Sequence, residues 1–236
     1  MIGSDKMTNR ERLKKALKVT FPVFTGYICL GIGFGILLES KGYGVLWALV
    51  MSITMFAGSM QYVAVDLIAS GASLISVAIT TLLVNARHLF YGISILDKYK
   101  GAGAKKAYMM HALTDETYSL VCSDDSNDKT LYFYISLLDH LYWITGCVSG
   151  AVIGSLFEFN SEGVDFVLTA LFVTIFIEQW LTTKNHLSAI IGVVSTVLCL
   201  LIFGNEMFLI PSMVLITVFL TILKKFTEHK EGRDDV

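Results

Sequence analysis

Long runs of apolar residues are the feature of this sequence that most limits how it can fold. A helix needs about 20 mainly apolar residues to cross the hydrocarbon core of a membrane, and this chain of 236 residues contains several runs of that length. Hydrophobic residues make up 54% of the chain and charged residues only 16%, which is more apolar side chain than a soluble domain can bury. We therefore predict an all-α polytopic membrane helix bundle with six to eight transmembrane segments. The clear candidate spans are 19–38, 45–68, 74–96, 131–157, 165–183, 186–203 and 207–223.

The same composition argues against a soluble enzyme, a disordered tail and a nucleic-acid-binding protein. The four cysteines are far apart and form no C-x-x-C pair, so we expect neither a disulfide framework nor a zinc site. Gly31, Gly33 and Gly35 lie inside an apolar run without the Lys-Ser/Thr pair of a phosphate loop. Close helix packing explains these glycines best, and no cofactor is expected.

Basic residues indicate which ends of the chain face the cytoplasm. Six of the 18 Lys and Arg lie before residue 19, and four more lie from Lys224 onward. We expect 1–18 to be a basic cytoplasmic segment, 19–223 to be a single transmembrane domain, and 224–236 to be a charged cytoplasmic tail.

The first half of the chain allows two topologies. The lysine-rich start of a predicted cytoplasmic loop, about 97–130, should lie inside, but three plain spans from an inside N-terminus would place it outside. In one solution, 45–96 crosses once and contains a broken or re-entrant segment near 56–72. In the other, the polar segment 107–122 is a real span, which gives eight crossings and an outside lysine cluster. The first is slightly favoured.

A first group of polar residues interrupts the apolar runs at 56–62, FAGSMQY. Polar groups at membrane depth are costly and are site candidates for that reason. Glycine permits a helix break, and a broken helix exposes N–H groups that can hold a carboxylate. We predict substrate-binding roles for Gly58, Ser59, Gln61 and Tyr62, against the alternative of ordinary small-residue helix packing.

A second group lies near the end of a long apolar run, where Asn85 and Arg87 are also predicted to bind substrate. Arg87 is the only Arg between residues 13 and 232, and its planar guanidinium suits a carboxylate. A span-end arginine that reaches the headgroups is the alternative.

Carboxylates and histidines at or near membrane depth form a third set, for which we predict ion or proton coupling. Asp115 and Glu116 are adjacent and could pair with Arg87 or carry protons. Asp139 and His140 lie inside the candidate span 131–157, and histidine titrates near physiological pH. His88 completes the set: His88, Asp115, Glu116, Asp139 and His140.

Two other classes of function remain open beside a solute carrier. An intramembrane enzyme could use Ser59 with His88 or His140, although G-x-S-x-G and H-E-x-x-H are absent. A passive channel would favour rings of pore-lining groups, which one chain cannot display. Scattered polar groups of both signs in apolar spans fit a solute carrier best.

Four motifs resemble the AzlC family of branched-chain amino acid permeases: FAGSMQY at 56–62, NARHLFYGISI at 85–95, LTDETYSL at 113–120 and, more weakly, DFVLTALF at 165–172. The resemblance covers roughly 15–225. It implies an exporter of branched-chain or similar neutral hydrophobic amino acids in the bacterial inner or plasma membrane. It also implies a small AzlD-type membrane subunit as partner, which this chain does not contain.

Such a substrate is a zwitterion with an apolar side chain, and it needs complementary groups for both charges. Gly58, Ser59 and Arg87 could hold its carboxylate. Gln61, Asp115 or Asp139 could accept from its ammonium, and these alternatives stay open. No nucleotide motif is present, which favours proton or sodium coupling over ATP.

Overall fold

The computed structural model describes residues 7–157, 169–170, 173, 176–177, 180–181, 186–208, 211–212 and 214–223. All regular secondary structure in these residues is helical, as the apolar runs predict. Contacts divide the chain into two units, Met1–Leu171 and Phe172–Val236. Much of the predicted span 165–183 and all of the predicted tail 224–236 lie outside the described residues.

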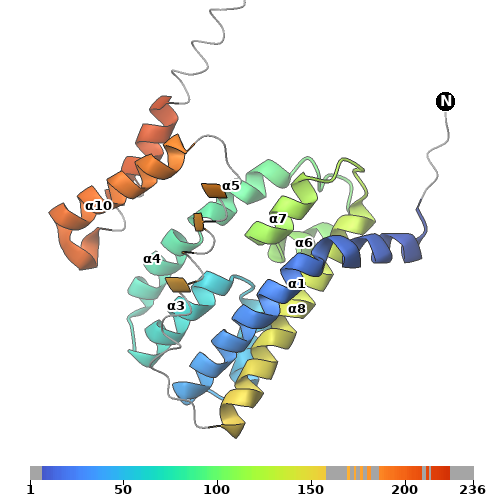
Figure 1. The fold of residues 1–236 in the computed structure, drawn as a ribbon, viewed down its shortest axis with the longest axis horizontal. Coiled ribbons are helices and arrows are strands. Elements are labelled where there is room, and N and C mark those ends of the chain that lie inside the picture. The colour runs from blue at the N-terminus through green and yellow to red at the C-terminus, as the bar shows by residue number, and fades with distance from the viewer. Residues whose placement is uncertain are drawn as a thin grey trace, which may run out of the picture. The chain divides into compact units, whose positions relative to one another are not determined.

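Two long helices, α1 (Asn9–Ser40) and α8 (Lys129–Leu156), run side by side in the first unit (Figure 1). Glycines allow their close contact, as the sequence predicts for Gly31 and Gly35. A Cβ added at Gly35 would lie 2.2 Å from the carbonyl oxygen of Cys147, and one added at Gly150 would lie 2.2 Å from that of Ile32. Residues later in α1 contact residues later in α8, so the two helices are parallel.

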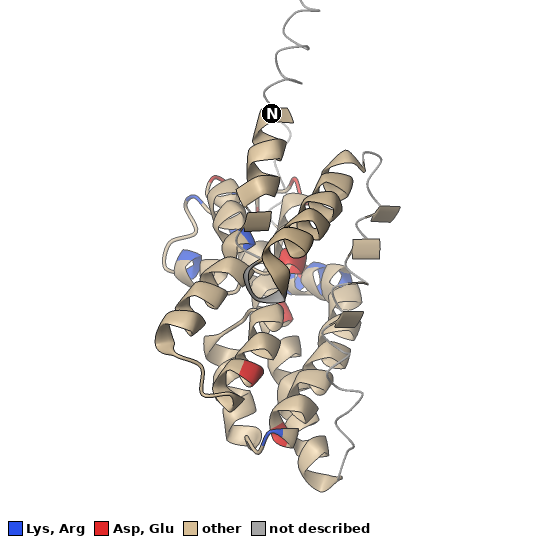
Figure 2. Cartoon of the chain, turned by 90° about the vertical axis from the view of Figure 1, so that its left-hand side faces the viewer, with Lys and Arg blue, Asp and Glu red and all other residues tan. Residues whose placement is uncertain are grey.

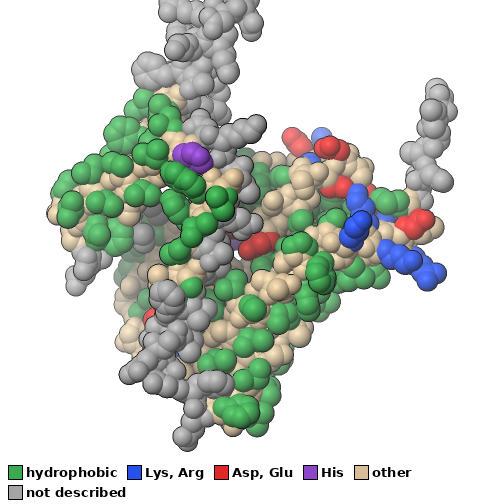
Figure 3. Space-filling model, viewed as in Figure 1, with side chains coloured by type: hydrophobic (Ala, Val, Ile, Leu, Met, Phe, Trp, Pro, Cys, Tyr) green, Lys and Arg blue, Asp and Glu red, His purple; other side chains and the backbone are tan. Residues whose placement is uncertain are grey.

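Helix α1 has 32 residues and is about 48 Å long at 1.5 Å per residue, so its two termini define two well-separated ends of the first unit. At the end that we call the N-end, Arg12 Nε donates to Asp128 Oδ2 at 2.6 Å and Lys15 Nζ to Asp124 Oδ1 at 2.5 Å. Lys98 Nζ donates there to the carbonyl oxygen of Asp124 at 2.8 Å. The N-terminus of α1, the 97–104 segment and the start of α8 therefore share one end. Charged side chains visible on one face gather near the start of α1, whereas apolar side chains cover much of the rest (Figure 3).

At the opposite end, which we call the far end, Lys41 Nζ lies 3.6 Å from Asp66 Oδ1. Helix α2 (Val45–Thr54) starts four residues after Lys41, and α3 (Gly58–Ala69) contains Asp66. Both helices therefore have one end at the far end, and they are joined by a break at 55–57. We call this pair the far-end hairpin; its break lies at the edge of the segment where the sequence predicts one.

A second pair of helices enters from the N-end. Helix α6 (Lys105–His111) follows the 97–104 segment, and α7 (Asp115–Cys122) returns to Lys98, whose Nζ binds the carbonyl oxygens of Val121 and Cys122. These helices, which we call the N-end hairpin, occupy much of the region predicted as a loop at 97–130. His111 Nε2 donates to the carbonyl oxygen of Ile53 at 3.0 Å, so the two hairpins meet near their tips.

Helices α4 (Leu74–Val84) and α5 (Ala86–Ile95) connect the far end to the N-end, with a bend of 47° at Asn85. The sequence predicts one plain span at 74–96, so this bend is a correction. The bend lies at Asn85, whose backbone ends one helix and begins the next. Figure 2 shows that charged residues are few along the described helices.

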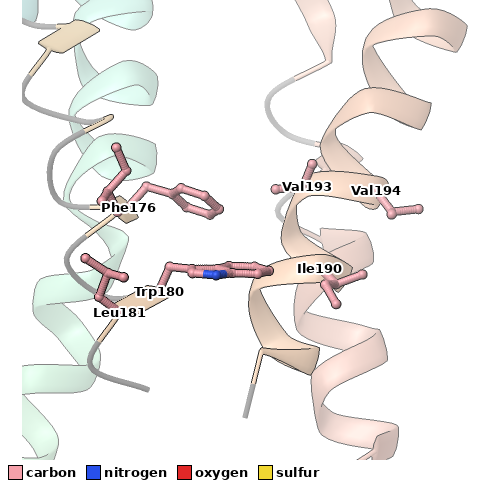
Figure 4. A pocket seen from close by; sticks show the side chains of 7 residues that line it. Phe176, Trp180, Leu181, Ile190, Val193 and Val194 are labelled. Atoms are coloured by element: carbon pink, nitrogen blue, oxygen red, sulfur yellow. The ribbon is translucent and has the colours of Figure 1, made fainter. Parts of the chain in front are cut away.

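The second unit contains α10 (Leu187–Met207), which covers the predicted span 186–203 and breaks its helical geometry at Gly204, φ 73°. An apolar pocket of about 480 Å³ lies between this helix and the residues before it. In Figure 4, Phe176 and Trp180 face Ile190 and Val193 across it.

Two described helices are long and apolar enough to cross a membrane, Asn9–Ser40 and Leu187–Gly204. The bent pair α4–α5 makes a third if it counts as one span.

Candidate functional site

Arg87 joins the tips of the two hairpins. It is the second residue of α5, directly after the bend. Its Nη2 donates to Ser59 Oγ at 2.9 Å, in the first turn of α3, and its Nη1 donates to Asp115 Oδ2, at the first residue of α7. The structure thus brings together Ser59, Arg87 and Asp115, which the sequence identifies from three separate motifs.

Three helices begin at this cluster, namely α3, α5 and α7. The N-terminus of a helix carries a partial positive charge and unpaired N–H groups. No side chain caps α3 or α5, whereas Thr114 caps α7. Together with the guanidinium of Arg87, these helix ends make the cluster suitable for an anionic group, and Asp115 supplies the one carboxylate bound there.

Trp143 of α8 fixes the first turn of α3. Its Nε1 donates to Gln61 Oε1 at 2.7 Å, and its ring would lie 3.0 Å from a Cβ added at Gly58. Gly58 therefore packs closely against Trp143, and a larger residue would crowd the indole ring. Tyr62 points elsewhere, because its hydroxyl donates to the carbonyl oxygen of Leu30 in α1 at 2.7 Å.

A row of polar side chains continues from Asp115 into the unit. Tyr27 of α1 donates to Glu116, and Thr117 Oγ1 lies within hydrogen-bonding distance of Asp139 Oδ2, at 2.7 Å. Asp139 is fully buried, at 0% exposure. It lies on α8 between two apolar clusters, one that includes Ile135 and one that includes Trp143.

Several buried polar atoms in this part of the first unit have no hydrogen-bond partner within the described residues. Two are donors, Arg87 Nε and Gln61 Nε2, and two are acceptors, Asp115 Oδ1 and Asp139 Oδ1. Asn85 Oδ1 and His88 Nδ1 are also unpartnered. Unpartnered buried polar atoms are uncommon in folded proteins, so the cluster offers both donors and acceptors to a ligand.

Neither histidine of the predicted set forms a hydrogen bond to Arg87 or Asp115 within the described residues. His140 Nε2 donates to the carbonyl oxygen of Ser52 at 3.1 Å, and its Nδ1 pairs with Tyr108 at 2.9 Å. His88 packs edge to face against Tyr91. None of the hydrogen bonds in the described residues joins Ser59 to either histidine, so the geometry gives no support to a Ser–His enzyme.

The sequence analysis does not identify Tyr27, Trp143 and Thr117, whose hydrogen bonds lie beside this cluster. Thr117 lies in the LTDETYSL motif and could have been found by the same polarity argument as Asp115. Tyr27 and Trp143 lie in apolar spans, where aromatic residues are common, and only their hydrogen bonds identify them. No group of three or more His, Cys, Asp and Glu in the described part of the chain could hold a metal ion.

Comparison with known proteins places this chain in a family. The family model described as AzlC protein matches residues 22–157. The chain is 44% identical over 222 residues to the branched-chain amino acid transport protein AzlC of Bacillus subtilis (strain 168), covering 92% of this chain and 87% of that protein. It is 42% identical to an uncharacterized membrane protein of Helicobacter pylori (strain ATCC 700392 / 26695), with 91% and 97% covered. It is 27% identical over 168 residues to the inner membrane protein YgaZ of Escherichia coli (strain K12), with 66% and 69% covered. No solved structure matches this chain.

Proposed function

The chain belongs to the AzlC family of membrane transport proteins, and from that premise we propose that it exports branched-chain or similar neutral hydrophobic amino acids. The relative from Bacillus subtilis is named for branched-chain amino acid transport. One observation in this chain carries the proposal furthest: unpartnered buried donors and acceptors flank the ion pair of Arg87 and Asp115.

A zwitterionic amino acid matches these atoms. Its carboxylate accepts from Arg87 Nε and the free N–H groups at the start of α3, and Gln61 Nε2 adds a further donor. Its ammonium donates to Asp115 Oδ1. Asp115 is preferred over Asp139 for this role because its side chain is 24% exposed, whereas Asp139 is enclosed behind Thr117.

The two hairpins approach this site from the two ends of the first unit. They enter from opposite ends of the first unit and meet at Arg87, as discontinuous helices do at the binding sites of many transporters. We assign the N-end to the cytoplasm because of its basic residues. The 97–104 segment shares this end with the start of α1, which supports the topology in which 45–96 crosses once.

A small AzlD-type membrane subunit completes the proposed exporter. Helix α4 has no buried residue, and its Leu74 and Ile75 are 88% and 73% exposed. This face needs lipid or another apolar helix to cover it, which supports a second subunit without identifying it.

Counterflow in vesicles tests the proposal. Vesicles that contain the chain and a small subunit should exchange labelled leucine, isoleucine or valine for internal leucine. Leucinamide, which lacks the carboxylate, and 4-methylpentanoate, which lacks the ammonium, should compete poorly. Lysine and glutamate serve as charged controls. Equal competition by leucinamide and leucine would show that the carboxylate is not recognised, and no exchange of any of the three amino acids would exclude the proposed substrate class.

Ser59→Ala removes one partner of Arg87 and should weaken leucine exchange. Ser70→Ala is its matched control, since Ser70 is exposed at the other end of the same helix and binds only the carbonyl oxygen of Leu67 in its own helix. Equal exchange by the two variants would remove Ser59 from the site.

A further inference from the structure

Five oxygen-bearing side chains form a continuous row that links two carboxyl groups. Tyr27 Oη lies 2.7 Å from Glu116 Oε2 and 2.6 Å from Thr114 Oγ1. Thr114 Oγ1 lies 3.1 Å from Thr117 Oγ1, which lies 2.7 Å from Asp139 Oδ2. Every step is within hydrogen-bonding distance. We call this row the hydroxyl chain.

The hydroxyl chain needs one more hydrogen than its hydroxyl groups carry. It contains four oxygen–oxygen links, and each link needs one hydrogen between its two atoms. Tyr27, Thr114 and Thr117 supply one hydrogen each, and an ionised carboxylate supplies none. All four links are therefore satisfied only when either Glu116 or Asp139 carries a proton.

Burial places this proton on Asp139 in the resting arrangement. Asp139 is 0% exposed, and within the described residues no Lys or Arg pairs with it. An unpaired carboxylate in an apolar interior is costly, and protonation removes that cost. Glu116 is only partly buried and lies at the other end of the hydroxyl chain, where a proton can be exchanged with water.

We propose that the hydroxyl chain conducts a proton between Glu116 and Asp139 and so couples transport to a proton gradient. This inference rests on the proposed function and specifies its ion. The proton of Asp139 passes to Thr117, and the hydroxyl protons of Thr117, Thr114 and Tyr27 each move one place along until Glu116 is protonated. Asp139 ends ionised, Glu116 ends neutral, and the total charge is unchanged. The reverse shift returns the proton.

The surroundings of the two carboxyl groups differ in charge. Tyr27, Tyr91 and His88 lie near Glu116. The residue before Glu116 is Asp115, which forms the ion pair with Arg87. Near Asp139 lie Tyr27, Tyr99 and the Glu116 carboxyl itself. Arg87, the cation of that neighbouring ion pair, is bonded to Asp115 and Ser59 in the structure. A substrate whose carboxylate binds Arg87 and whose ammonium binds Asp115 therefore changes the field at Glu116, which links binding to the proton.

Substitutions at Thr117 test conduction without changing a charge. Thr117→Val keeps the shape of the side chain and removes the hydroxyl, and Thr117→Ser keeps the hydroxyl. In vesicles with the small subunit, a leucine gradient should move protons in the wild type and in Thr117→Ser. Thr117→Val should lower that proton flux about tenfold or more, which corresponds to about 1.4 kcal/mol in the barrier, while leucine counterflow without a gradient continues. Thr145→Val is the matched control, since Thr145 lies exposed on α8 and binds only the Leu141 carbonyl oxygen of its own helix.

Infrared spectroscopy tests the extra proton independently of transport. The wild-type protein should show a protonated-carboxyl band near neutral pH that shifts in D2O and is lost in Asp139→Asn. The absence of such a band, or its persistence in Asp139→Asn, would overturn the proposal even if no amino acid is transported. Unchanged proton flux in Thr117→Val, or leucine accumulation driven by sodium and not by a proton gradient, would also overturn it. A wild type that shows the band but exchanges no amino acid would contradict the proposed function instead.

Discussion

Arg87 and Asp115 form an ion pair between the bend of α4–α5 and the first residue of α7, with side-chain exposures of 33% and 24%. Breaking a partly buried pair leaves one charge uncompensated, which costs more than the pair contributes as a whole. Arg87→Ala should therefore lower the free energy of unfolding by about 1–3 kcal/mol, a cost reduced by the partial exposure of the pair. The amount of folded protein in the membrane should fall as a result. The double variant Arg87→Ala/Asp115→Asn should recover part of this loss, as measured by membrane abundance and thermal unfolding in detergent. No recovery would mean that the pair is not energetically coupled.

Glycine contacts between α1 and α8 give a second prediction. A Cβ at Gly35 would meet backbone atoms of Cys147 and Ala151 at 2.2 and 2.3 Å, so Gly35→Ala must push the helices apart. We expect a loss of about 1–3 kcal/mol, as for other overpacked sites. Gly26→Ala is the control on the same helix, because nothing lies within 4 Å of a Cβ there. Equal thermal stability of the two variants would contradict the close contact.

Cysteine labelling tests the topology. In a cysteine-free background, Lys41→Cys at the far end should react with an impermeant thiol reagent from outside the cell, and Lys100→Cys should be protected. Both positions are exposed in the structure. Labelling of Lys100→Cys from outside would instead support eight crossings.

The ion pairs of the N-end should weaken in acid. Partial burial raises the pKa of Asp124, but the hydrogen bonds from Lys15 and Ser126 lower it by more than burial raises it. The pKa of Asp124 therefore lies below its ordinary value of 3.8. The pKa of Asp128 is lowered in the same way, chiefly by Arg12 against the effect of burial.

A carboxylate with a lowered pKa stabilises the folded state above its unfolded pKa, and this contribution is lost as the pH falls through its folded value. Thermal stability should therefore fall more steeply below pH 3.8 in the wild type than in Asp124→Asn/Asp128→Asn. We expect a difference of about 1 kcal/mol, measured by unfolding in detergent. Parallel pH profiles for the two proteins would contradict this prediction.

Much of the helical architecture follows from the sequence because apolar length and glycine spacing are local properties. This reasoning predicts the helical runs of α1, α8 and α10, the close packing at Gly31 and Gly35, and the break before Gly58. Among the described helices, α1 and α10 are long and apolar enough to cross a membrane. The family resemblance, carried by motifs around Ser59, Arg87 and Asp115, is confirmed by the match over residues 22–157.

The sequence offers pairing of Arg87 with Asp115 or Glu116 as one alternative, but it cannot decide between the alternatives or predict the contact with Ser59. Ser59, Arg87 and Asp115 are each identified by polarity at membrane depth, but their contact depends on how two hairpins fold back. Tyr27 is 87 residues from Thr114, and nothing in the apolar run around it indicates a hydrogen bond. Polarity finds the residues, whereas tertiary packing decides their partners.

Leucine counterflow by Arg87 variants tests the central claim most directly, namely that Arg87 holds the substrate carboxylate. Transport is measured in vesicles with the small subunit and divided by the amount of inserted protein. Arg87→Lys keeps the charge but loses the planar guanidinium, so exchange should be weakened. Arg87→Ala/Asp115→Asn should insert and exchange no leucine. Normal leucine exchange by Arg87→Ala would contradict the account.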